Sequence, residues 1–344
     1  MKKVAIIGAG QVAEKVHAAY YLTRTADLEL VAVVDPDEKR GADFARQNGF
    51  ARSYVDAGTM FATEKPDLVS ICTPNRFHFD NVMMALRHGA AVMCEKPPAM
   101  TANEAKMMRD FAAEKGLTLA YDFHHRFATD MTEVKRAYTD GMLGEVYVTK
   151  AKALRRSGVP GWGSFTNKAL QGGGPLIDIG IHMLDAAMYV LDFPKVKKVT
   201  AKMFQKIGTK KSEGTFGTWD PAKYDVEDAV FAFIEFENGG LLELETSFVL
   251  QMKDKAVLNV EFFGDEAGAT LFPAEVYTDR AGELVTLLKR DVADEERHVK
   301  SMEAFVNRAL GVDVMVADAE QGYQIQRLIE AIYESAEKGE SVYL

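Results

Sequence analysis

The chain opens on a glycine-containing stretch that strongly limits what its first domain can be. An apolar run over residues 4–7 predicts a buried strand, and Gly8, Gly10 and Ala13 follow it as a helical pattern begins. In the spacing G-x-G-x-x-A, the first glycine permits a tight turn, and the second lets the backbone approach a pyrophosphate. The alanine lets the helix pack closely on the strand. The same spacing also occurs at ordinary turns before helices, so the context must decide between the two.

The context favours a dinucleotide. Gln11 and Val12 begin the helix, where unpaired N–H groups and the positive dipole end favour phosphate. A second apolar run, over residues 29–34, ends on Asp35, about 20 residues beyond the motif, where a carboxylate accepts both ribose hydroxyls. Asp35 would also repel a 2′-phosphate, which predicts NAD as the cofactor. Arg40 leaves NADP possible.

Composition sets the remaining limits. The chain has 344 residues, 47% of them hydrophobic, which predicts two domains, and the change from alternating short apolar runs to long β-type runs after Asp122 places them over residues 1–122 and 123–344. A net charge of −10 argues against nucleic acid or an anionic membrane as a main partner, and no apolar run reaches transmembrane length. The only cysteines, Cys72 and Cys94, fall near strand ends and suggest no disulfide, so we expect a cytoplasmic protein and a small-molecule substrate.

The first domain is expected to be α/β, with a doubly wound parallel sheet of the Rossmann type. Short apolar runs alternate with helical patterns, and we expect strands over residues 4–7, 30–34, 53–54, 68–72, 91–94 and 118–121. Ligands of such sheets bind beyond the carboxyl ends of the strands. The residues that follow the strands are therefore the candidate cofactor site: Asp35, Thr73, Pro74, Asn75, Glu95, Lys96 and Asp122.

The second domain is expected to be α+β, with an open and mostly antiparallel sheet. Long β-type runs cover residues 145–154, 196–207, 226–237, 241–250 and 257–263, and Asn238-Gly239 predicts a hairpin in which both residues have positive φ. Both faces of the run around Phe231 and Phe233 look apolar, which predicts a homodimer or homotetramer packed through this sheet. Helical patterns cover residues 302–310 and 318–338, and the C-terminal helix could pack back on the first domain.

A second candidate segment begins with Gly172-Gly173-Gly174-Pro175, which predicts a flexible entry into a helix that runs to about residue 191. On this helix Asp178 and His182 are spaced i, i+4 and share a face, and the rest of the circumference is mainly apolar. Taken alone, a solvent-facing polar stripe or a core histidine is the simpler interpretation. A metal site is a poorer one, because no third ligand is evident and His124-His125 cannot be tied to this pair.

Lys96 follows a buried parallel strand at the same sheet edge as the glycine turn, so its ammonium should reach toward a nicotinamide; the alternative is a solvated surface lysine. Oxidation of a carbinol by hydride removal also needs a base for the hydroxyl proton and a donor that polarises the oxygen. His182 and Lys96 suit those two roles.

Together these motifs resemble the glucose-fructose oxidoreductase / inositol dehydrogenase superfamily over nearly the whole chain. The segments that carry the resemblance are Gly8-x-Gly10-x-x-Ala13, Thr73-Pro74-Asn75 with His78, Glu95-Lys96-Pro97, and the glycines that lead to Asp178-x-x-x-His182. The resemblance implies oxidation or reduction of sugars and cyclitols with NAD or NADP, by dimers or tetramers. It also implies that Lys96, Asp178 and His182 form the catalytic group, and that Asn75 and His78 lie near the cofactor or in the loop beneath it.

The substrate is less visible in the sequence. Arg155, Arg156 and Trp162 follow an expected strand and offer guanidinium donors and an aromatic face, which suit hydroxyl-rich or anionic rings. A subunit contact would explain the arginines equally well, and Arg126 is a further pocket candidate. We therefore expect an NAD(P)-dependent oxidoreductase acting on a secondary alcohol of a sugar, sugar acid or cyclitol. The alternatives are a glycosidase or epimerase of the same fold without net redox change, and a non-catalytic nucleotide sensor.

Overall fold

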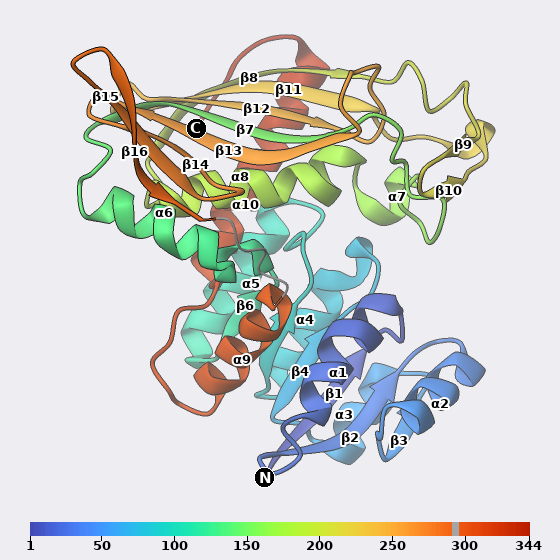
Figure 1. Cartoon of the computed structure of the whole chain (residues 1–344). Coiled ribbons are helices and arrows are strands. Elements are labelled where there is room, and N and C mark those ends of the chain that lie inside the picture. The colour runs from blue at the N-terminus through green and yellow to red at the C-terminus, as the bar shows by residue number, and fades with distance from the viewer. Residues whose placement is uncertain (291–295) are drawn as a thin grey trace. The chain divides into compact units, whose positions relative to one another are not determined.

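The computed structural model describes residues 1–290 and 296–344, which form two compact units (Figure 1). The first unit comprises residues 1–124 and 298–326, and the second comprises residues 125–297 and 327–344. The units therefore do not follow a single cut in the sequence, whereas our expected domains met at one boundary, between residues 122 and 123.

The first unit is built on a parallel sheet of six strands in the order β3-β2-β1-β4-β5-β6, the arrangement of a Rossmann fold. The six strands expected from the sequence are all present; the strand over 91–94 has the expected ends, and the other five shift by one or two residues at one end. They are β1 (Lys2–Ile7), β2 (Leu28–Val34), β3 (Arg52–Tyr54), β4 (Leu68–Ile71), β5 (Ala91–Cys94) and β6 (Leu119–Tyr121).

Helices follow the strands of this sheet in alternation. They are η1 (Ala13–Ala18), α1 (Ala19–Leu22), α2 (Glu38–Gln47), α3 (Ala57–Glu64), η2 (Asn75–Phe77), α4 (His78–Arg87) and α5 (Ala102–Lys115). Two late helices also contribute to this unit. The helix α9 (Arg297–Ala309) begins one residue before the unit's second segment, and α10 (Ala319–Lys338) begins within that segment. Met302, Phe305 and Val306 of α9 belong to the same core as Tyr21 and Leu28, so apolar burial ties this distant segment to the sheet.

The second unit contains a nine-stranded sheet in the order β16-β15-β14-β13-β7-β12-β11-β8-β17. Its strands are β7 (Val146–Arg155), β8 (Val196–Phe204), β11 (Ala229–Phe236), β12 (Leu241–Ser247), β13 (Ala256–Gly264), β14 (Gly268–Thr270), β15 (Glu275–Arg280), β16 (Glu283–Lys289) and β17 (Val342–Tyr343). Among these described strands β12 and β7 pair in parallel and the other neighbours pair antiparallel, as an α+β domain with a mostly antiparallel sheet requires.

Helices pack on one face of this sheet. The π-helix η4 (Leu176–Gly180) and the helix α8 (Ile181–Val190) contact β7 and lie near β12 and β13 (Figure 1). The remaining short elements are η3 (His124–Phe127), α6 (Thr129–Thr139), α7 (Lys168–Gln171), β9 (Glu213–Gly214), β10 (Gly217–Thr218) and η5 (Pro221–Lys223). The β11–β12 hairpin closes as expected, but positive φ occurs at Gly239 and not at Asn238.

The opposite face of the sheet is more polar than the sequence of β11 alone suggested. Phe233 on this face is 48% exposed, but its neighbours carry cross-strand ion pairs. These pairs are Lys198–Glu235, Lys150–Glu243 and Lys152–Glu261. Our premise of two apolar faces is therefore wrong, because β11 is more apolar than the strands beside it. None of the described helices has both the length and the low polarity needed to cross a bilayer.

Candidate functional site

The first unit's candidate site begins at the turn after β1. Gly8 has a φ of +99°, and a Cβ there would lie 2.6 Å from the carbonyl oxygen of Cys72, so glycine is required. A Cβ at Gly10 would meet no protein atom within 4 Å, which leaves open space beside the helix that begins at Gln11 and continues through Val12. The hydroxyl of Thr73 is buried without a hydrogen-bond partner among the described residues. Open space at a helix N-terminus and an unsatisfied hydroxyl both suit a bound nucleotide.

Asp35 stands at the carboxyl end of β2, as predicted, and it is buried. Its carboxylate accepts hydrogen bonds from the backbone N–H of Ala9 at 3.0 Å and of Asp37 at 2.9 Å. The guanidinium of Arg40 donates to both carboxylate oxygens, at 2.9 and 2.5 Å. Burial by itself would raise the pKa of Asp35, but the hydrogen bonds from Arg40 and the two N–H groups outweigh it and lower that pKa. Arg40 therefore binds the carboxylate that would select the ribose.

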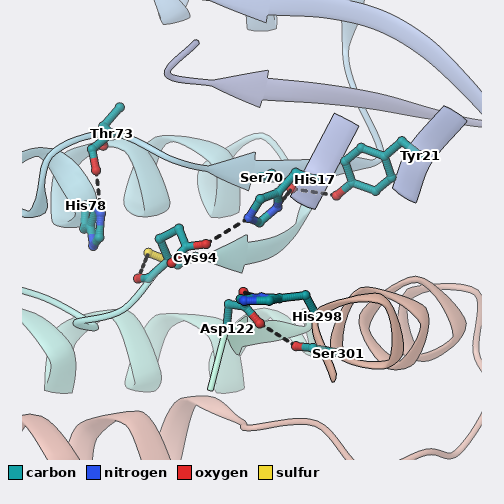
Figure 2. Close-up of polar contacts among 10 residues, drawn as sticks. His17, Tyr21, Ser70, Thr73, His78, Cys94, Asp122, His298 and Ser301 are labelled. Atoms are coloured by element: carbon teal, nitrogen blue, oxygen red, sulfur yellow. Dashed lines mark hydrogen bonds and ion pairs between the residues drawn. The ribbon is translucent and has the colours of Figure 1, made fainter. Parts of the chain in front are cut away.

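A buried polar network lies under the same sheet edge (Figure 2). Nε2 of His17 lies 3.1 Å from Oε1 of Glu95, and Nδ1 of His17 lies 2.9 Å from the Ser70 hydroxyl. The hydroxyl of Tyr21 reaches the same serine at 2.6 Å. His17 and Tyr21 come from the helix after the glycine turn, and Glu95 immediately precedes Lys96. The network thus ties the cofactor-facing helix to the loop that carries Lys96.

A second buried histidine ties the loops after β4 and β5. Nδ1 of His78 lies 2.7 Å from the carbonyl oxygen of Pro97, and Nε2 lies 2.9 Å from that of Thr73 (Figure 2). Burial lowers the pKa of His78, and a neutral imidazole has one N–H, so the ring donates to one of these two carbonyl oxygens at a time and packs against the other. His78 therefore lies beneath both loops. Pro74 precedes η2, and the buried Asn75 is its first residue.

Asp122 follows β6 and is also buried. Its carboxylate accepts from the Ser301 hydroxyl at 2.7 Å and lies 3.1 Å from Nδ1 of His298, both contributed by α9 (Figure 2). Asp122, His124 and His298 each offer a ligand atom within 4.8 Å of the others. The two imidazoles, however, are stacked at 3.7 Å with an interplanar angle of 26°. Lone pairs lie in the ring planes, so this arrangement fits hydrogen bonding better than a shared metal ion.

In the second unit, the entry to η4 is held closely rather than being flexible as expected. The buried carboxylate of Glu227 accepts from the N–H of Gly174 at 3.0 Å and of Leu176 at 3.3 Å, and the Tyr333 hydroxyl donates to it at 2.9 Å. A Cβ at Gly173 would collide with the Tyr333 hydroxyl, and a Cβ at Gly174 would lie 2.7 Å from the Glu227 carbonyl oxygen. Burial raises the pKa of Glu227, against these hydrogen bonds. The glycines are needed for close packing at the start of the helix.

Asp178 and His182 lie on the two consecutive parts of this helix. Asp178 is in the π-helical turn η4 and is partly exposed, whereas His182 is in the first turn of α8 and is buried. The imidazole of His125 packs edge-on against that of His182, with centroids 5.1 Å apart. Arg297 places a guanidinium nitrogen 2.8 Å from Nδ1 of His125. Because a guanidinium only donates, Nδ1 of His125 accepts, and the proton of the neutral ring is on Nε2.

Arg126 is not at the wall of a pocket, where we expected it. Its side chain is fully buried and donates to both carboxylate oxygens of Asp185, at 2.8 and 2.5 Å. The rings of Tyr189 and Phe193 lie 4.9 and 5.3 Å from the guanidinium carbon. Burial raises the pKa of Asp185, and Arg126 acts in the opposite direction. The sequence showed neither the partner nor the burial of this arginine, whose role here is structural.

The other candidate substrate residues diverge in their environments. Arg155 is partly buried, with its guanidinium carbon 4.9 Å from the centroid of Phe216, and it interacts electrostatically with Asp178. Arg156 donates to the carbonyl oxygen of Lys253 at 3.0 Å. Trp162 is 49% exposed. The second unit therefore brings Arg155 near Asp178. Lys96, the remaining residue of the expected catalytic group, belongs to the first unit.

Comparison with known proteins identifies the family. Residues 2–123 match an oxidoreductase family with an NAD-binding Rossmann fold, and residues 135–344 match the C-terminal alpha/beta domain of the same family. The chain is 61% identical to the D-glucoside 3-dehydrogenase of Escherichia coli K12 over 342 residues, which are 99% of this chain and 97% of that protein.

Solved structures agree on the fold. A levoglucosan dehydrogenase in complex with NADH and L-sorbose is 22% identical, with a TM-score of 0.84 over 99% of this chain and 98% of that one. GenD2 from gentamicin A biosynthesis, in complex with NAD, is 25% identical, with a TM-score of 0.80 over 100% and 96% of the two chains. Because both parts of the chain match the family and one relative is 61% identical to it, the chain belongs to the glucose-fructose oxidoreductase / inositol dehydrogenase family of NAD-binding oxidoreductases.

Proposed function

We propose that this protein is an NAD-dependent dehydrogenase that oxidises the 3-hydroxyl of D-glucosides. The observation that carries this proposal is the 61% identity to a D-glucoside 3-dehydrogenase across 99% of the chain. Sugars, sugar acids and cyclitols other than glucosides remain within the class of secondary alcohols that the sequence led us to expect, and they belong in the substrate screen.

The cofactor is held by the first unit in this proposal. The helix that starts at Gln11 and Val12 receives the pyrophosphate, and Asp35 receives the adenosine ribose. The loops with Thr73, Asn75 and Lys96 line the nicotinamide end. In these loops the unsatisfied Thr73 hydroxyl offers a donor and an acceptor. The nicotinamide supplies the hydride acceptor when the cofactor is bound.

The proton chemistry falls to three side chains. His182 takes the proton of the reacting hydroxyl, Lys96 donates to the same oxygen, and Asp178 orients the two. Two features support a fixed placement of these side chains. The residues on either side of Lys96 contact buried histidines: His17 contacts the carboxylate of Glu95, and His78 contacts the carbonyl oxygen of Pro97. The helix that carries Asp178 and His182 is fixed at its start by Glu227.

The test is turnover with NAD, followed by absorbance of NADH, on methyl D-glucoside and on its 3-deoxy analogue. We expect NADH to accumulate with the first compound only. His182→Ala should lower kcat by about 10²- to 10⁴-fold while the Kd for NAD changes little, since general-base catalysis contributes on that order. Lys96→Ala should lower kcat comparably.

The same assay separates the rival functions. A glycosidase or epimerase of this fold would consume the glucoside without accumulating NADH, and a nucleotide sensor would bind NAD without turnover. Near-normal turnover in His182→Ala would return His182 to a structural role and leave Lys96 or another residue as the proton acceptor.

Assembly and compartment complete the proposal. We place a homodimer or homotetramer contact on the open face of the nine-stranded sheet, where Phe231 and Phe233 lie among cross-strand ion pairs. Both cysteines are buried free thiols, which suits a reducing compartment such as the cytoplasm. Light scattering at micromolar concentration tests the assembly, and a monomer mass would contradict it.

A further inference from the structure

Two aromatic side chains stand exposed at the end of β7. The indole of Trp162 is 49% exposed and the ring of Phe216 is 40% exposed, with centroids 5.9 Å apart. Phe165 also packs edge-on with the indole, with centroids 6.3 Å apart. We call Trp162 and Phe216, with Arg155 beside them, the aromatic platform. Exposed aromatic groups that adjoin one another are a common feature of binding surfaces.

The platform is built on a fixed backbone. The N–H of Gly161 donates to the carbonyl oxygen of Phe216 at 2.8 Å, and the N–H of Thr215 donates to that of Ser157 at 2.8 Å. A Cβ at Gly161 would lie 2.5 Å from the amide nitrogen of Thr218, so the two segments touch through their backbones. These contacts fix the two backbone segments against each other, and the guanidinium of Arg155 lies over one face of Phe216 while both rings keep part of their surface exposed.

The platform adjoins the proposed catalytic residues of the same unit. Arg155 lies two and four residues after Ala153 and Ala151 along β7 and so shares their face, and those alanines are buried on the face that η4 and α8 cover. Its guanidinium carbon lies 4.9 Å from the centroid of Phe216, and its charge interacts with that of Asp178. Arg155 therefore connects the two groups, because it interacts with Asp178 and also contacts Phe216 of the aromatic platform.

We propose that Trp162 and Phe216 bind the ring attached to the anomeric oxygen of the glucoside, an aglycone or a second sugar, through its apolar face. This proposal rests on the proposed function. When carbon 3 of the reacting ring is at Asp178 and His182, the anomeric carbon is two carbons away, so its substituent extends beyond the reacting centre and within this proposal passes Arg155 to the platform. An aromatic ring and the C–H face of a pyranose can both stack on an indole, and Arg155 offers donors to hydroxyl groups of a sugar.

The kinetic test compares kcat/KM for methyl D-glucoside, phenyl D-glucoside and a glucose disaccharide. Trp162→Ala should lower kcat/KM by about 3- to 10-fold for substrates with a second ring, and by less than about 2-fold for the methyl glucoside, as loss of one stacking contact implies. Trp162→Phe should retain most of the preference. Tyr343→Ala, which removes an exposed aromatic ring from the edge strand β17, is the matched control and should alter none of the three.

A loss confined to the phenyl glucoside would identify an aromatic aglycone as the occupant, and a loss confined to the disaccharide would identify a second sugar. Equal effects on all three substrates, or none, would overturn the proposal. A change of molecular mass in Trp162→Ala would assign the platform to a contact with a second copy of the chain and would also overturn it.

Fluorescence supplies a readout that does not depend on turnover. The chain contains two tryptophans, and Trp219 is buried, so a ligand that stacks on the platform should change the emission of Trp162 alone. Phenyl D-glucoside should change the emission of the wild-type protein but not of Trp162→Phe. If the wild type fails to oxidise methyl glucoside, the proposed function fails; if the emission is unchanged by phenyl glucoside and disaccharide, the platform proposal fails.

Discussion

Replacement of Arg126 by methionine should destabilise the protein strongly. The change leaves the carboxylate of Asp185 buried without its bidentate cation, because both side chains are almost completely inaccessible to water. Removal of one partner from a buried ion pair costs about 3 to 5 kcal/mol. We therefore expect Arg126→Met to lower the free energy of unfolding in urea by that amount, with the KM of the surviving folded protein unchanged.

Two further variants separate the buried pair from charge loss in general. Arg46→Met removes a cation from the exposed pair with Asp43, where a change of about 0 to 1 kcal/mol is expected. The double variant Arg126→Met with Asp185→Leu removes both charges and should recover much of the loss, since well-packed apolar groups often replace a buried pair at little cost.

The pH dependence has a definite sign. Burial already raises the pKa of Asp185 from its ordinary 3.8, and loss of Arg126 raises it further. The unfolded chain then releases this proton at a lower pH than the folded variant does. The folded variant is consequently penalised as pH rises above about 4, and its deficit should be larger at about pH 7 than at about pH 4. An unchanged free energy of unfolding together with a raised KM would refute the structural role and return Arg126 to the substrate pocket.

Three other variants test the first unit. Asp35→Ser should narrow or reverse the preference for NAD over NADP, because it removes the negative charge and leaves Arg40 to receive a 2′-phosphate; an unchanged ratio of the two Kd values would contradict this. His17→Leu should lower kcat on the order of 10-fold with little change in the Kd for NAD, since Glu95 loses the contact that positions the Lys96 loop; an unaltered kcat would count against it. Although burial opposes it, hydrogen bonding from His298 and Ser301 lowers the pKa of Asp122, so its stabilisation is lost as pH falls below the ordinary 3.8. Asp122→Asn should flatten that acid limb of the unfolding curve, and an identical limb would disprove the assignment.

The parallel sheet was predictable because its signal is local. Each strand is a short apolar run, and the residue after it carries the chemistry, so Asp35, Glu95 and Asp122 could be placed at one edge from spacing alone. The strands β14, β15 and β16 were missed. They are short or carry polar and charged residues, and their pairing with β13 and with one another is set by contacts that no local period records.

Helix type was a second limit. The sequence predicted that Asp178 and His182 share a face at the spacing of an α-helix, whereas η4 is π-helical, with i→i+5 in place of i→i+4 hydrogen bonds. A buried helix shows a mainly apolar circumference in both cases, so the sequence pattern does not distinguish them, whereas the surrounding contacts are long-range. A Cβ at Gly180 would lie 2.9 Å from Thr246, whose hydroxyl donates to the carbonyl oxygen of Pro175 at 3.0 Å.

The consecutive glycines before that helix show most clearly what sequence reasoning lacks. Three glycines in a row indicate backbone freedom, and freedom was the interpretation we gave them. In the structure two of them are required for space, since the hydroxyl of Tyr333 and the carbonyl of Glu227 occupy the volume that a side chain would fill. Both groups come from segments far along the chain, so no local pattern contains them. The Glu227 carboxylate also accepts the N–H of Gly174, so the close approach of these segments allows the hydrogen bond that holds the start of the helix. The glycines therefore fix the backbone that carries Asp178, and they do not make it flexible.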